Sequence, residues 1–113
     1  MLQFLDNNAA RQTTNLQNKI QSLSIPEQVF YRMILKKMFD AQKKTDLDFI
    51  VFKTDAISYE IYATGYTSKD KYVEKEFVEH KMTASDINLF DIWLKLDRTY
   101  EGDILTFLLP EDY

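Results

Sequence analysis

The residues of this chain that could do chemistry lie around its only histidine, His80. Glu79 and Lys81 flank it, and alternate residues of a strand point to the same face of a sheet. Glu79 and Lys81 would therefore share a face if this stretch is a strand. A metal-dependent nuclease needs carboxylates to hold a divalent ion and a lysine to steady the attacking water or the scissile phosphate. Asp70 or Asp55 would have to supply the second carboxylate.

The spacing of Glu79 and Lys81 matches the carboxylate-x-lysine half of the pattern found in restriction nucleases. Such triplets occur in any highly charged strand, the domain is small for that fold, and the surrounding acids would repel DNA. A small metal-dependent nuclease is therefore the alternative interpretation. The simpler one is a lone histidine on a charged strand, which rarely makes a site by itself.

Composition excludes most other catalytic arrangements. The chain has no Cys, one His and two Gly, which excludes a zinc finger, a Cys–His dyad, a P-loop and a dinucleotide-binding fingerprint. A Ser–His–Asp triad would depend on His80, and no Ser lies in the sequence context of a nucleophile elbow. We therefore expect a protein that is not an enzyme and that uses no cofactor and no metal.

Charge is divided unevenly along the chain. Residues 1–44 carry seven basic and three acidic side chains, a balance of +4, whereas residues 45–113 carry seven basic and fifteen acidic ones, a balance of −8. The sequence therefore predicts two different surfaces on one small domain, a helical basic segment (1–44) and a mainly β acidic segment (45–113). The 113 residues fit a single domain.

The acidic half suggests a surface that contacts another protein. Proteins that block nucleic-acid-binding enzymes often present acids to a basic groove, whereas acids on an edge strand can also serve only to prevent aggregation. Tyrosines anchor interfaces because they offer a large area with little rotamer entropy. The candidate protein-binding residues are Asp70, Glu74, Glu76, Glu79, Tyr62 and Tyr66.

These observations predict a cytosolic protein that binds another macromolecule, such as an inhibitor, an adaptor or an immunity-type protein of phage origin. The partner would be a protein, with a nucleic-acid-binding enzyme as one class. Direct binding to nucleic acid is not expected at a pI near 4.9. No apolar run approaches the ~20 residues of a membrane helix. The second alternative is a structural protein that self-assembles, for instance as a homodimer through its first helix.

Two helices are expected in the basic segment. Residues 2–23 place Leu5, Leu16 and Ile20 on one face, but their many Asn residues are poor helix formers. Such a helix needs a packing partner, either the domain's own core or another protomer. Ser24 and Glu27 form a capping-box pattern that opens a stronger helix over residues 25–44.

Strands are expected from residue 45 onward, where the period changes to two. Residues 47–52 and 57–64 predict a β-hairpin. Residues 72–82 predict a third strand, residues 87–97 a strand or a helix, and residues 104–109 a final strand. The expected fold is α+β, with the two N-terminal helices on one face of an antiparallel β-meander of four to five strands. Parallel pairing is not expected because the connections are too short for crossovers.

Overall fold

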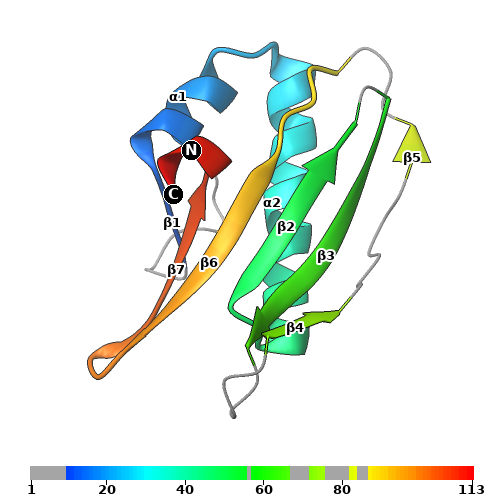
Figure 1. The fold of residues 1–113 in the computed structure, drawn as a ribbon. Helices are drawn as coiled ribbons and strands as arrows, with labels where there is room; N and C mark the ends of the chain where they lie inside the picture. The colour runs from blue at the N-terminus through cyan, green and yellow to red at the C-terminus, as the bar shows by residue number, and fades with distance from the viewer. Residues whose placement is uncertain (1–9, 56, 67–71, 76–81, 84–86) are drawn as a thin grey trace.

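The computed structural model describes residues 10–55, 57–66, 72–75, 82–83 and 87–113. The chain is α+β, with two α-helices and a mixed sheet (Figure 1). The elements are, in chain order, β1 (Arg11–Gln12), α1 (Thr14–Gln21), α2 (Ile25–Thr45), β2 (Phe49–Thr54), β3 (Ser58–Tyr66), β4 (Tyr72–Lys75), β5 (Met82–Thr83), β6 (Ile92–Thr99), β7 (Gly102–Leu108) and the 3₁₀ turn η2 (Pro110–Asp112).

The prediction of an antiparallel meander is wrong. The strand order is β1-β7-β6-β2-β3-β4, with β5 paired to β3. The hairpin of β2 and β3 is confirmed, with Val51 opposite Tyr62. The other neighbour of β2 is β6. β6 follows β5 in sequence, but it pairs antiparallel with β2. A meander would have placed β6 beside the strand that precedes it.

The expectation of antiparallel pairing throughout also fails at one edge. β1 pairs parallel to β7, with Arg11 opposite Thr106 and Gln12 opposite Phe107. Short connections exclude parallel pairing only between strands that follow each other closely. Almost the whole chain lies between β1 and β7, so it supplies the long connection that parallel strands need.

Of the helix predicted over residues 2–23, residues 2–9 lie outside the described residues, and within the rest α1 begins later than the sequence pattern predicted. Arg11 and Gln12 form a strand, and α1 begins only at Thr14, after the N-cap residue Thr13. The hydroxyl of Thr13 accepts a hydrogen bond from the Leu16 amide. The backbone amide of Thr13 donates a hydrogen bond to the carbonyl of Phe107 at 3.0 Å. Residue 13 thus ends the sheet pairing and starts the helix.

The predicted second helix is confirmed, and its cap is the one that the sequence indicated. Ser24 is the N-cap of α2 and forms a capping box with Glu27. The Glu27 carboxylate accepts hydrogen bonds from the Ser24 amide at 3.1 Å and the Ser24 hydroxyl at 2.7 Å. It also accepts one from the Asn88 amide at 2.9 Å, which ties the helix start to the segment before β6.

β4 lies at the start of the strand predicted over residues 72–82, β5 begins at its last residue, Met82, and residues 76–81 lie outside the described residues. Residues 87–97, for which strand and helix were both open, are irregular up to Asp91 and then form β6. The predicted last strand is β7, which begins earlier than expected, at Gly102.

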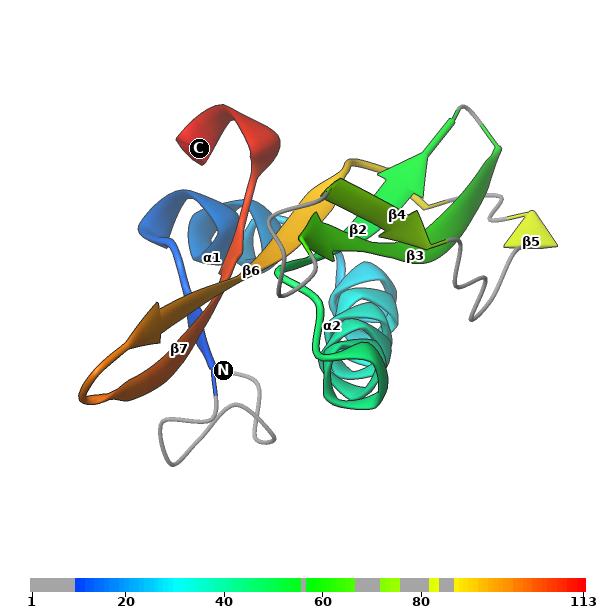
Figure 2. The ribbon, with the colours of Figure 1, turned by 60° about the horizontal axis from the view of Figure 1, so that its bottom comes forward.

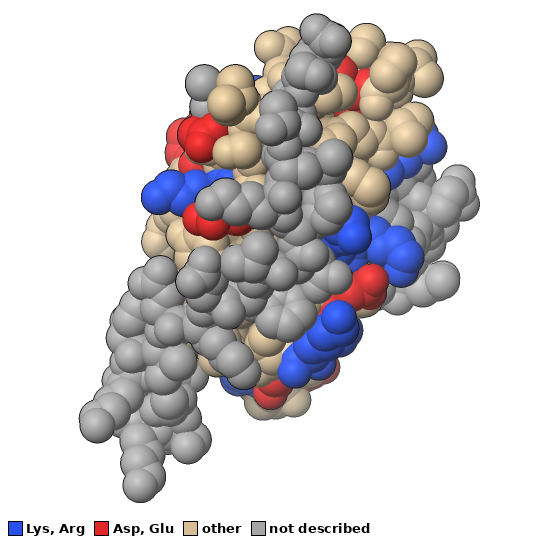
Figure 3. All heavy atoms as spheres, turned by 90° about the vertical axis from the view of Figure 1, so that its right-hand side faces the viewer, with Lys and Arg blue, Asp and Glu red and all other residues tan. Residues whose placement is uncertain are grey.

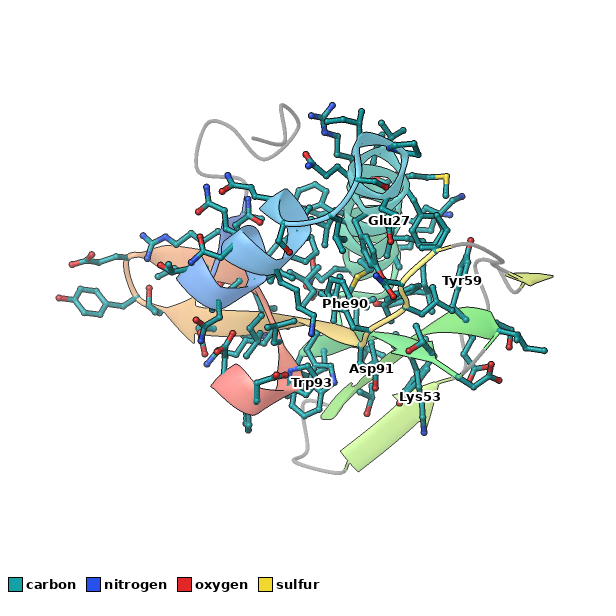
Figure 4. The ribbon with its side chains drawn as sticks, turned by 90° about the horizontal axis from the view of Figure 1, so that it is seen from above. Glu27, Lys53, Tyr59, Phe90, Asp91 and Trp93 are labelled. Atoms are coloured by element: carbon teal, nitrogen blue, oxygen red, sulfur yellow. The ribbon has the colours of Figure 1, made fainter. Side chains whose placement is uncertain are left out.

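The sheet has two different faces. One face packs against the helices. Buried residues of both helices and of this face form the core: Leu16 and Ile20 from α1, Tyr31, Ile34, Leu35, Met38 and Ala41 from α2, and Ile50, Phe52, Tyr59, Ile61, Ala63, Ile92, Leu94, Leu96, Leu105 and Phe107 from the strands. Figure 4 shows both helices on this side and η2 on the other. We call the other side the open face and define it by Phe49, Val51, Tyr62, Trp93, Lys95 and Leu108.

Stability is expected to fall in acid because of Glu27. The hydrogen bonds from Asn88 and Ser24 hold the pKa of the Glu27 carboxyl below its ordinary value. A lowered pKa in the folded state contributes stability above the unfolded pKa of about 4.3, and that contribution is lost as the pH falls through the folded value. Urea midpoints between pH ~6 and ~3 should therefore fall, and Glu27→Gln should flatten the decline. The exposed Glu101 is the matched site, and a Glu101→Gln variant that flattened the decline equally would contradict this assignment.

Gly65 is required where β3 passes the segment that follows α2. A Cβ on Gly65 would lie 2.7 Å from the backbone nitrogen of Asp48 and 3.4 Å from the Cβ of Leu47. Backbone cannot move aside as a flexible side chain can, so Gly65→Ala should lower the free energy of unfolding by about 1–3 kcal/mol. Urea denaturation measures this loss, and an unchanged midpoint would contradict the close approach.

Candidate protein-binding face

The open face carries a row of large side chains across four strands. In the strand register, Leu108 of β7 lies opposite Trp93 of β6, Trp93 opposite Val51 of β2, and Val51 opposite Tyr62 of β3. Directly opposite residues of antiparallel strands share a face. Leu108 and Val51 are buried, whereas Trp93 and Tyr62 are half-buried. In this row, therefore, the aliphatic side chains are covered and the two aromatic side chains reach solvent.

Three aromatic rings form a cluster at one end of this face. The ring centroids of Phe49 and Trp93 are 6.1 Å apart, those of Phe49 and Tyr113 are 5.8 Å apart, and those of Trp93 and Tyr113 are 5.4 Å apart. All three pairs meet edge to face, which aromatic quadrupoles favour. Tyr113 comes from the chain end, after η2, and its side chain remains 71% exposed. The cluster is thus held by the sheet and reaches solvent through Tyr113.

η2 is fixed to the start of α1, and this places Tyr113. The Asp112 carboxylate accepts hydrogen bonds from the Asn15 amide group and the Thr13 hydroxyl, both at 2.7 Å. These two bonds hold the pKa of Asp112 below its ordinary value. The Asp112 carboxylate also accepts from the Leu109 amide at 3.2 Å. Residues far apart in the sequence therefore position the last aromatic ring of the cluster.

Charged side chains share this side of the sheet with the cluster. The ammonium of Lys95 is 5.6 Å from the centre of the Tyr113 ring, a cation–π distance, and 3.4 Å from the Asp97 carboxylate. Lys53 lies opposite Glu60 in the register of β2 and β3. Figure 4 shows Trp93, Asp91 and Lys53 on the side of the sheet away from Glu27. The arrangement suits contact with a surface that is partly apolar and partly charged.

A small pocket lies at the turn between β2 and β3. Its volume is about 110 Å³, and it is lined by Lys53, Thr54, Asp55, Ser58, Tyr59 and Glu60. Pockets that hold drug-sized ligands are ~300–1,000 Å³. The Asp55 carboxylate accepts hydrogen bonds from the Ile57 and Ser58 amides at 2.9 and 2.8 Å, so it builds the turn. We therefore give this pocket no ligand.

The structure places some of the predicted contact residues and leaves others outside its description. Tyr62 lies on the open face. Tyr66 lies opposite Tyr72 at the end of β3, and Glu74 lies opposite Thr64 in β4. The remaining predicted residues, Asp70, Glu76 and Glu79, lie outside the described residues, as do His80 and Lys81 of the nuclease hypothesis. Within the described ranges, no group of three His, Asp or Glu side chains could hold a metal ion.

Sequence reasoning missed the aromatic cluster. A signal existed for Trp93, because the alternation of residues 90–97 puts it on the face opposite Ile92 and Leu94. Phe49 carried the same signal within β2. No sequence signal could place Tyr113 beside them, because that contact depends on how the chain end returns to α1.

No family model, no curated protein and no solved structure matches this chain. Among the described residues, no helix combines the length and the apolar character needed to cross a membrane.

Proposed function

We propose that this protein is a non-enzymatic binding module that holds another protein against the open face of its sheet, as a cytosolic inhibitor or adaptor. The observation that supports this is the cluster of Phe49, Trp93 and Tyr113 on the side of the sheet away from both helices. Trp and Tyr are the side chains most often found at the energetic centre of protein interfaces.

The cluster is already ordered before any partner arrives. Its rings are held by contacts with one another and, through Asp112, by hydrogen bonds to α1. Binding by rigid aromatic rings loses little conformational entropy, which favours affinity. Tyr62 extends the same surface across β3. A partner that covered this face would remove from water the aromatic edges that are now half-exposed.

Charge supports a partner with a basic surface. Residues 45–113 carry a balance of −8, and opposite charge on a partner would raise the rate of association at low salt. A nucleic-acid-binding enzyme with a basic groove is the partner class we propose. The predicted acids Asp70, Glu74, Glu76 and Glu79 would take part in that contact, and reversing the charge of Glu74 together with its neighbours tests this part separately.

Trp93 offers a direct test because it is the only tryptophan in the chain. Protein labelled with 5-fluorotryptophan gives a single ¹⁹F resonance, which reports on the open face. A partner captured from the native host should shift or broaden this resonance. Tyr113→Ala should weaken the captured partner's affinity by about tenfold or more, because interface aromatics commonly contribute that much. Tyr100→Ala is the control, because Tyr100 is 99% exposed and lies away from the cluster.

The proposal fails if a captured partner binds without changing the Trp93 resonance and binds Tyr113→Ala as tightly as the unchanged chain. In that case the partner uses another surface. Cleavage of plasmid DNA in the presence of Mg²⁺ or Mn²⁺ that Glu79→Gln abolished would instead support the nuclease hypothesis.

A further inference from the structure

The outer face of α2, defined by Ile25, Val29, Met33, Arg32 and Lys36, carries apolar residues that the domain does not bury. Ile25, Val29 and Met33 follow one another at steps of four, so they form a line along the helix surface. Their side chains are 70%, 55% and 40% exposed. A single exposed aliphatic residue needs no explanation, but three in line on one helix form a surface that can accept a partner.

Basic side chains continue this line toward the end of the helix. Arg32, Lys36 and Lys43 are exposed. Within the helix, the acid on this side is Asp40, which lies 3.5 Å from Lys36 with both side chains about half exposed. Figure 3, which views the molecule from the right-hand side of Figure 1, shows uncharged atoms toward the upper end and, below them, Lys and Arg side chains with some Asp and Glu between them. The outer face of α2 is therefore apolar near its start and positive beyond it.

The far end of the β6–β7 hairpin is acidic, so its charge is opposite to that of the outer face of α2. Beyond Leu96, β6 pairs only with β7 among the described strands, and all residues of the segment Asp97–Asp103 are exposed. We call this segment the acidic ribbon, because it carries Asp97, Glu101 and Asp103 against one Arg, a net charge of −2. Tyr100, at its tip, is 99% exposed. Figures 1 and 2 show the ribbon extending beyond the rest of the sheet.

The acidic ribbon cannot reach the apolar part of α2 in its own molecule. Arg98 at its base donates a hydrogen bond to the carbonyl of Asp46 at 3.1 Å, and Asp46 is the C-cap of α2. Val29 is about 25 Å from that end, because a helix rises about 1.5 Å per residue. The tip of the ribbon is only about 7 Å of strand beyond Arg98. The two surfaces can therefore meet only between two molecules.

We propose that the protein self-associates head to tail, with the acidic ribbon of one copy lying on the outer face of α2 of the next copy. The charges are complementary, since Glu101 would face Arg32 and Lys36. The other two acids of the ribbon, Asp97 and Asp103, lie 3.4 and 3.8 Å from Lys95 and Arg98 of their own molecule. The ring of Tyr100 would cover the exposed aliphatic residues Val29 and Met33. The inference goes beyond the proposed function and leaves the open face free for another partner.

Two properties follow from this geometry. The contact joins different surfaces of identical molecules, so it repeats from copy to copy and produces rings or open chains. It is also small, because a seven-residue ribbon is well below the ~20–30 residues per side of a standard interface. We therefore expect association at high protein concentration, and we expect salt to weaken it by screening the charges.

Analytical ultracentrifugation of the full chain from ~10 µM to ~1 mM tests this inference. In about 50 mM salt the average mass should rise with concentration above the 13.4 kDa of one chain, and in about 500 mM salt the rise should shrink. A mass that stays at 13.4 kDa up to ~1 mM in low salt overturns the proposal.

Two single-surface variants identify the contact. Tyr100→Ala damages the ribbon and Val29→Asp damages the helix face, so each alone should stay monomeric. A mixture of the two retains one intact ribbon and one intact helix face, so it should form a complex of two chains and nothing larger. Both positions are exposed, and unchanged unfolding midpoints would show that the variants fold.

Two further outcomes would overturn the head-to-tail proposal. Self-association that survives both substitutions overturns the proposal, because another surface then carries it. Binding of phosphatidylserine vesicles that Val29→Asp abolishes, in a chain that stays monomeric, overturns it as well and assigns the helix face to a membrane. Tyr113→Ala should leave self-association unchanged, so failure of this inference is distinguishable from failure of the open-face proposal.

Discussion

Replacing Tyr31 by alanine should lower the free energy of unfolding by about 3–5 kcal/mol, the usual cost of removing a buried aromatic ring. The Tyr31 side chain is fully buried at the contact between α2 and the sheet. Its ring stacks on Phe90 at 4.5 Å and meets Phe30 and Phe52 edge to face at 5.1 and 6.1 Å. A cavity at this point would separate the helix from the strands.

The hydroxyl of Tyr31 adds to this effect. It donates a hydrogen bond to the carbonyl of Asn88 at 2.6 Å and accepts one from the Phe90 amide at 3.2 Å. Burial raises the pKa of this hydroxyl, so it remains protonated and able to donate at any physiological pH. It thereby satisfies two backbone groups of the irregular segment that leads into β6.

Urea denaturation of three variants separates these contributions. Tyr31→Phe should lose about 1–2 kcal/mol, because backbone groups lose their partner while the ring remains. Tyr31→Ala should lose several times more. Tyr100→Ala is the matched control for removal of a tyrosine ring at an exposed site and should change stability by less than about 0.5 kcal/mol. Equal losses for Tyr31→Ala and Tyr100→Ala would contradict the central position of Tyr31.

Elements that depend on neighbouring residues could be predicted from the sequence. The capping box of Ser24 and Glu27 is local, and so is the apolar spacing that places Ile34 and Met38 on the buried side of α2. The hairpin of β2 and β3 was predictable for the same reason, because a short turn fixes which strand pairs with which.

Elements that depend on distant residues could not be predicted. The place of β6 beside β2, rather than beside the strand before it, is decided by which apolar faces meet over the helices. The parallel pairing of β1 with β7 joins the two ends of the chain, and no local pattern in Arg11 and Gln12 indicates it. Within the described residues, the start of α1 was predicted too early for the same reason, because β1 pairs with β7 at residues that a helical pattern could also accommodate.

The candidate site also combines features that neighbouring residues determine with features that distant residues determine. The orientation of Tyr62 followed from alternation along β3, since Tyr59 and Ile61 are buried on the opposite face. The same alternation does not extend to Ile57, which is 64% exposed because it lies in the turn before β3 begins. The two proposed interaction surfaces, the aromatic cluster and the acidic ribbon, arise where strands or the chain end extend past their neighbours.

Replacing Leu16 by alanine tests whether α1 packs on its own molecule or on a second copy. Its amide-rich sequence left open whether its apolar side packs on the domain's own core or on another protomer. In the structure Leu16 is fully buried and Ile20 nearly so, within the same core as Phe107 of β7. Leu16→Ala should therefore lower the free energy of unfolding by about 2–5 kcal/mol, as large-to-small substitutions in cores do.

The concentration dependence of that loss distinguishes packing within one molecule from packing between two. If Leu16 packs within its own molecule, the urea midpoints of Leu16→Ala and of the unchanged chain should differ by the same amount at ~5 µM and ~50 µM protein, because intramolecular packing does not follow mass action. Asn18→Ala, at an exposed position of the same helix, is the matched control and should change stability little. A Leu16→Ala loss that grew with protein concentration would instead mean that α1 packs against a second copy, and the head-to-tail contact through α2 would then have a competitor.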